Sequence, residues 1–174
     1  KVGDLLNRSS QITYFFLIIS IGFIGGIIAF KLSTPSQNEW LISIMDPRLL
    51  LEGKPAIWQS LWPAFTPYVF LVLLATHQWF RHATRLVVVC KSAFFGFCSA
   101  YLIATQNAFW NYALWWFPVQ FLYTCLLLLF SIVLVPKPFY NSRKKGIHWK
   151  RIIVISVMTM IILLIELVII HFMF

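Results

Sequence analysis

The sequence predicts an all-α integral membrane protein, a bundle of five transmembrane helices with short interfacial helices between the first two. The 174 residues are 60% hydrophobic and only 11% charged, whereas an ordinary soluble domain carries roughly 25% charged residues. Five apolar stretches each approach the ~17–25 residues that a helix needs to cross the hydrocarbon. So few charges cannot cover a soluble core of this size, which argues against soluble enzymes and nucleic-acid binders.

The expected spans cover about residues 12–30, 64–80, 86–105, 113–135 and 152–174, and we treat 1–174 as a single membrane domain. Continuous apolar runs within them argue against the alternating strands of a β-barrel. The first span follows two basic residues, as a secretory signal does, but it exceeds the roughly 7–15 apolar residues of a signal sequence. We therefore expect it to be retained in the membrane.

The net charge of +9 has a topological explanation. With the N-terminus inside, most Lys and Arg residues fall on one side of the membrane, and only Lys31, Arg48 and Lys54 fall on the other. The positive-inside rule then predicts a multi-pass protein of the cell membrane with a cytoplasmic N-terminus and an external C-terminus.

The outer segment, residues 31–63, holds three of the five acids and four prolines. Residues 36–39 have the Ser-x-x-Glu spacing of a capping box, which predicts that a short helix begins there. Asp46 followed by Pro47 reads as an N-cap with proline at the first helical position, opening a second turn over Arg48–Glu52. We expect two pieces of interfacial helix.

The basic inner loop, residues 136–151, carries no acid and is interrupted by proline and glycine. Topology alone explains such a loop, and the alternative is a contact for anionic lipid or a cytoplasmic partner. The candidate contact residues, which include the turn between the second and third spans, are Arg81, Arg85, Arg143, Lys144, Lys145, Lys150 and Arg151.

Six of the eight tryptophans fall at the expected outer ends of the spans: Trp40, Trp58, Trp62, Trp110, Trp115 and Trp116. An interfacial belt explains this placement, because the amphipathic indole ring favours the headgroup level. An aromatic cleft for a peptide or lipid substrate is the alternative.

Small residues recur at helical spacing in two spans. Gly22 and Gly26 form a GxxxG pair in the first, and Ser92, Gly96 and Ala100 share one face of the third. Such faces let helix backbones approach closely, so each of these helices is expected to pack tightly against a neighbour in the bundle or in another subunit.

Three residues inside the spans are candidate functional or assembly sites. Glu166 lies deep in the last span and must face the bundle, be protonated or find a donor, so its role is either proton or substrate handling or a structural contact. Lys91 is close enough to the inner end of its span to snorkel to the interface, and we do not expect it to pair with Glu166. Pro118 predicts a kink near the outer leaflet, with Gln120 available for freed backbone groups.

The histidines and cysteines form no pattern of metal ligands or catalytic groups. The four histidines include no i,i+4 pair, and the three cysteines, an odd number, all lie in spans. No nucleophile elbow, zinc-protease helix or phosphate loop is present. We therefore expect no catalytic, cofactor-binding or metal-binding residues, and we do not expect the protein to be an enzyme.

The order of the spans, the long outer segment and the stretch Arg85–Tyr101 resemble the stage II sporulation protein M family. Within that stretch the similarity rests on Lys91, the small residues after it and the glycine-aromatic step at Gly96. Ser92 stands where many members have glycine. The resemblance implies a noncatalytic multi-spanning subunit, and the short chain is more similar to the compact relatives found in circular bacteriocin systems beside an ATP-binding cassette ATPase.

The leading hypothesis is a membrane subunit of a bacterial complex for export, maturation or immunity of a hydrophobic peptide, with an ATPase as energy source. The alternative is a membrane scaffold for peptidoglycan-remodelling enzymes, as in sporulation engulfment, with a peptidoglycan hydrolase as partner. An autonomous proton-coupled transporter using Glu166 is the weaker alternative. Membrane lipid and other membrane subunits, or further copies of the chain, are expected partners, and nucleic acid is not.

Overall fold

The computed structural model describes residues 2–50, 56–76, 80, 83–105, 112–134 and 149–173. The described residues are almost entirely helical and contain no strand. Short 3₁₀ and π segments, η1 and η3, accompany six α-helices. In chain order the elements are α1 (Val2–Leu32), α2 (Pro35–Met45), η1 (Pro47–Leu50), α3 (Ile57–Thr76), α4 (Thr84–Ala104), η3 (Tyr112–Trp116), α6 (Phe117–Leu134) and α7 (Trp149–Met173).

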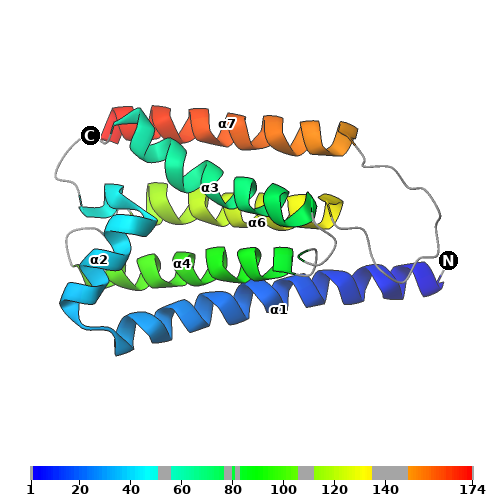
Figure 1. Cartoon of the computed structure of the whole chain (residues 1–174), viewed down its shortest axis with the longest axis horizontal. Coiled ribbons are helices and arrows are strands. Elements are labelled where there is room, and N and C mark those ends of the chain that lie inside the picture. The colour runs from blue at the N-terminus through cyan, green and yellow to red at the C-terminus, as the bar shows by residue number, and fades with distance from the viewer. Residues whose placement is uncertain are drawn as a thin grey trace.

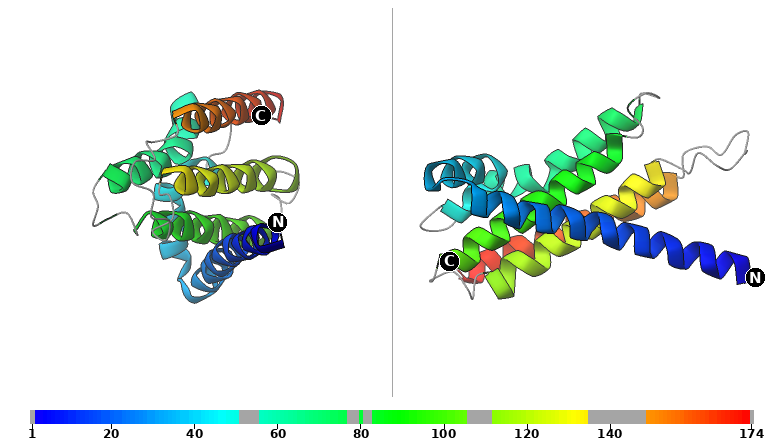
Figure 2. Two further views of the ribbon diagram at one scale, coloured as in Figure 1. Left: turned by 90° about the vertical axis from the view of Figure 1, so that its right-hand side faces the viewer. Right: turned by 90° about the horizontal axis from the view of Figure 1, so that it is seen from below.

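The long helices run along the long axis of the molecule and alternate in direction, so that the two termini lie at opposite ends (Figure 1). Seen end on, α7, α6, α4 and α1 follow one another across the molecule, with α3 beside them (Figure 2). Helix α4 packs on α1, α3 and α6, and α7 packs on α6 and α3. Helix α2 and η1 lie at the end where α1 finishes.

Three helical stretches are long and apolar enough to cross a membrane: Thr84–Ala104, Ala113–Leu134 and Lys150–Phe172. They correspond to the last three expected spans. The apolar part of α1, Phe16–Leu32, is shorter, and α3 is not among the three. Length and composition of the described helices thus identify three candidate spans, fewer than the five predicted.

Helix α3 begins at Ile57, seven residues before the predicted start at Ala64, and includes two internal prolines. The side-chain oxygen of Gln59 accepts a hydrogen bond from the backbone N–H of Ala56 at 2.8 Å and so caps the N-terminus of α3. The prolines remove two backbone donors, and the hydroxyl of Thr66 donates to the Trp62 carbonyl at 2.6 Å within the same stretch. Each proline frees the carbonyl four residues before it, at Gln59 and Pro63, and the Thr66 hydroxyl bonds a different carbonyl.

The predicted capping box at residues 36–39 is wrong by two residues. Helix α2 begins at Pro35, and the backbone N–H of Thr34 donates to the Gln37 side chain at 3.0 Å. The reason is that proline lacks an N–H and has its φ fixed near the helical value, which favours the first helical position. The second turn begins at Pro47 as predicted, whereas its predicted end at Glu52 lies outside the described residues.

The small residues of α1 and α4 face each other. A Cβ atom on Gly22 would lie 2.6 Å from the Cβ of Ser92. One on Gly26 would overlap the carbonyl of Ala93, and one on Gly96 would overlap the carbonyl of Phe23. These two helices are therefore in backbone-to-backbone contact, the arrangement that small residues at four-residue spacing permit. Ala100, one turn after Gly96, is half-buried.

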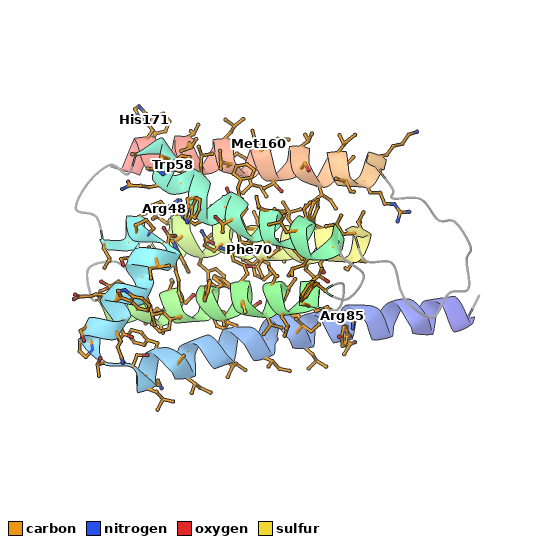
Figure 3. The ribbon with its side chains drawn as sticks, viewed as in Figure 1. Arg48, Trp58, Phe70, Arg85, Met160 and His171 are labelled. Atoms are coloured by element: carbon orange, nitrogen blue, oxygen red, sulfur yellow. The ribbon has the colours of Figure 1, made fainter. Side chains whose placement is uncertain are left out.

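Large apolar side chains cover much of the exterior. Ile21 of α1, Phe70 of α3 and Met160 of α7 are each about half exposed or more, at 66%, 55% and 47%. Figure 3 labels Met160 on α7, the helix along the upper edge of the view. Apolar exteriors this extensive are typical of proteins whose surroundings are apolar, in agreement with a membrane location.

Candidate functional site

A buried cluster of charges lies where the outer segment meets α7. Arg48, Asp46 and Glu166 are 6%, 4% and 0% exposed. The Arg48 guanidinium donates two hydrogen bonds to Asp46, from Nε to Oδ1 at 2.6 Å and from Nη2 to Oδ2 at 2.8 Å. Its Nη1 donates to Glu166 Oε1 at 2.7 Å. The guanidinium carbon, Cζ, lies 5.4 Å from the centre of the Trp115 ring. One guanidinium therefore bridges two carboxylates from segments far apart in the sequence.

The other donors of the cluster come from η3 and α6. The indole Nε1 of Trp116 donates to Asp46 Oδ2 at 3.1 Å. The hydroxyl of Tyr123 donates to Glu166 Oε2 at 2.9 Å. All four carboxylate oxygens thus accept hydrogen bonds, which is the condition under which buried charges are tolerated.

Burial and ion pairing act in opposite directions on Asp46 and Arg48. Burial disfavours the carboxylate, but the Arg48 charge and the hydrogen bonds from Arg48 and Trp116 outweigh it, so the pKa of Asp46 lies below its ordinary value. Burial also disfavours the guanidinium, but Asp46 and Glu166 raise the pKa of Arg48 above its ordinary value. Both groups stay ionised.

The sequence Asp46-Pro47-Arg48 suits this bridge. Asp46 is the C-cap of α2, and its backbone N–H donates to the Ile42 carbonyl at 2.8 Å. Pro47 then begins η1. The side chain of Arg48, two residues after Asp46, turns back to pair with the Asp46 carboxylate. The network fastens this part of the outer segment to the C-terminal half of α7.

A cavity of about 470 Å³ adjoins the network between α2, α3, α4 and α6. Its wall is apolar and aromatic, with Trp40, Trp62, Phe94 and Phe95 among the lining residues, and its polar groups include Asp46, Lys91 and Gln120. This volume lies within the ~300–1,000 Å³ of small-ligand sites, which are also mostly apolar with a few placed polar groups.

A second cavity of about 370 Å³ continues the first along α3 and α4. The two share five lining residues, Thr66, Pro67, Phe70, Lys91 and Phe94. Phe70, which Figure 3 labels, and Phe94 are 55% and 42% exposed, so the rim opens to the exterior of the bundle. We call the two cavities together the lateral groove.

Lys91 lies at the junction of the two cavities. Its ammonium donates to Gln120 Oε1 on α6 at 2.9 Å. The prediction that Lys91 snorkels to the inner interface is therefore wrong, because its side chain crosses to α6 and bonds an amide there. The side-chain oxygen of Gln120, the residue expected to serve the backbone near Pro118, accepts this bond.

The other candidate residues are spread over the molecule. Pro118 is exposed at the start of α6, directly after the π-helical turn η3, and is not among the residues that line the groove. Arg85 donates to the Tyr14 hydroxyl at 3.2 Å and so links α4 to α1. Lys150 and Arg151 are exposed in the first turn of α7. Arg81, Arg143, Lys144 and Lys145 lie outside the described residues.

The expected tryptophan belt divides into two groups. Trp40, Trp58 and Trp62 are 62%, 67% and 53% exposed, as residues of an interface are. Trp115 and Trp116 are 3% and 2% exposed and contact the charge network instead, so their assignment to the belt is wrong. Trp110 lies outside the described residues.

Sequence reasoning missed Arg48 and Asp46 as members of the site. It counted Arg48 only as an outer charge and Asp46 only as a helix cap. The signal that could have found them is local: a charged pair around a proline lies between two apolar segments, and the last span carries an acid that needs a cationic partner.

No family model matches the chain, and neither a curated protein nor a solved structure matches it. The relation to the stage II sporulation protein M family therefore stays a prediction.

Proposed function

We propose that this chain is a noncatalytic membrane protein whose lateral groove takes up the apolar part of a ligand from the lipid phase. The observation that carries the proposal is the groove itself, which has apolar walls, a rim of exposed aromatic side chains and Lys91 with Gln120 at its junction. Ligands of this kind reach a site sideways, through an opening between α3 and α4.

We further propose that all five long helices cross the bilayer, with the N-terminus cytoplasmic. The alternating direction of the helices (Figure 1) supports this topology. The exposed apolar side chains on α1 and α3 support it too. These are the two long helices that are not among the three identified as long and apolar enough to cross a membrane. The loops between α3 and α4 and between α6 and α7 then fall on the basic side, as the positive-inside rule requires.

Within a bacterial complex, a membrane protein of this kind would serve export, maturation or immunity of a hydrophobic peptide. An ATPase docked on the basic inner side would supply the energy. The scaffold for peptidoglycan-remodelling enzymes is the second candidate, and the charge network favours it in one respect: it holds part of the outer segment rigidly, as a docking surface requires. Proteins that copurify after gentle solubilisation separate the two, since export predicts an ATPase and the scaffold predicts a hydrolase.

Photo-crosslinking tests the groove directly. A benzophenone amino acid in place of Phe94, on the rim, is expected to form a discrete adduct with a bound ligand in cells. The matched control is the same replacement of Met160, which is similarly exposed on α7 at 47% against 42% for Phe94. Bulk lipid reaches both positions, so identical products from the two positions would contradict uptake by the groove.

A further inference from the structure

Lys91 is a partly buried residue whose ammonium forms no salt bridge with a carboxylate of the described residues. Within the described part of the chain, its ammonium donates to the neutral amide oxygen of Gln120. An ammonium has three donors, and one is used here. Charged side chains within membrane helices usually pair with one another or with backbone carbonyls, because an unpaired charge there is costly.

The two buried acids nearest to Lys91 are already engaged. Both oxygens of Asp46 accept from Arg48, and Oδ2 also accepts from Trp116. Glu166 accepts from Arg48 and Tyr123. Arg48 offsets only one of these two negative charges, so the charge of Lys91 balances the cluster as a whole. The Lys91 ammonium still keeps donors available where the two cavities join.

The size of the groove favours a ligand with a single hydrocarbon chain over a helical peptide. The cavities measure about 470 and 370 Å³, whereas a transmembrane helix is roughly 10–12 Å in diameter and could place only a few side chains there. A single hydrocarbon chain is thin and flexible enough to follow the groove along α3 and α4. The apolar lining favours such a chain, and Lys91 complements a negative group at one end of it.

We propose that the lateral groove binds a single-chain anionic lipid, with its carboxylate or phosphate on the Lys91 ammonium and its acyl chain between α3 and α4. An ion pair in such a low-dielectric site is far stronger than one in water, so the anionic group selects the ligand. This inference rests on the proposed function, because it names the chemistry of the ligand that the groove takes up.

The test uses the full chain in lipid nanodiscs and two brominated probes, dibromostearate at alkaline pH and its neutral methyl ester. Trp40, Trp62 and Trp116 line the first cavity, so a bromine atom bound there quenches tryptophan fluorescence. We expect dibromostearate to bind about tenfold more tightly than the ester, which corresponds to about 1.4 kcal/mol.

Substitutions at Lys91 show whether the preference comes from its charge. Lys91→Met is expected to lose the preference and to bind the two probes with equal affinity, and Lys91→Arg is expected to keep the preference. Equal affinities in the unmodified protein, or a preference that persists in Lys91→Met, would overturn the anionic site while leaving the groove intact. Failure of both probes to bind would overturn the groove, and with it the proposed function. Displacement of bound probe by an apolar peptide but not by stearate would assign the groove to a peptide instead.

Discussion

Arg48→Ala should destabilise the protein by about 3–5 kcal/mol, the usual cost of removing one partner from a buried ion pair. The substitution leaves the carboxylates of Asp46 and Glu166 buried without their shared cation. We expect a large fall in Tm in mild detergent, or loss of folded protein on expression. The measurement is thermal unfolding followed by size-exclusion chromatography and circular dichroism.

Glu166→Gln is the matched comparison for Arg48→Ala. Glutamine keeps an oxygen that accepts from Arg48 or Tyr123, and Arg48 keeps its two hydrogen bonds to Asp46. The fall in Tm should therefore be clearly smaller than for Arg48→Ala. If Arg48→Ala is as stable as the unmodified protein, the network does not hold the outer segment.

Gly26→Ala should separate α1 from α4, because the added methyl group overlaps the carbonyl of Ala93. Overpacking of this kind typically costs about 1–3 kcal/mol. The chain offers an adjacent control: a Cβ atom on Gly25 meets nothing within 4 Å. Gly25→Ala should be neutral or slightly stabilising, since alanine favours helix by up to about 1 kcal/mol over glycine. Equal effects at the two positions would show that α1 does not pack on α4 through this face.

The sequence predicts the helical class and the approximate position of three spans well, because these follow from composition and the length of apolar runs. The spacing of Gly22, Gly26 and Gly96 likewise predicts two closely packed helix faces. It does not predict that these faces contact each other, since small residues fit any partner. Helix α3 begins earlier than predicted because the prediction followed the apolar run from residue 64, whereas the Gln59 side chain caps the helix near Ile57.

The site was less predictable than the fold. Glu166 was identified as an acid in need of a donor, yet its cationic partner is 118 residues away in the sequence, and pairing at that distance depends on tertiary structure. Lys91 was identified from its depth, but the direction of its side chain depends on Gln120 of another helix. The groove itself arises where α2, α3, α4 and α6 meet, and no single segment carries a pattern that predicts it.

Native mass spectrometry of the intact protein released from detergent tests the central claim that the lateral groove holds a ligand. Thr66 lines both cavities, so Thr66→Trp should fill the groove, whereas Val157→Trp adds the same ring to the exposed face of α7, where Val157 is 51% exposed. We predict that the unmodified protein and Val157→Trp retain a bound amphiphile that Thr66→Trp has lost. The same bound mass in all three proteins, or none in any of them, would contradict the claim.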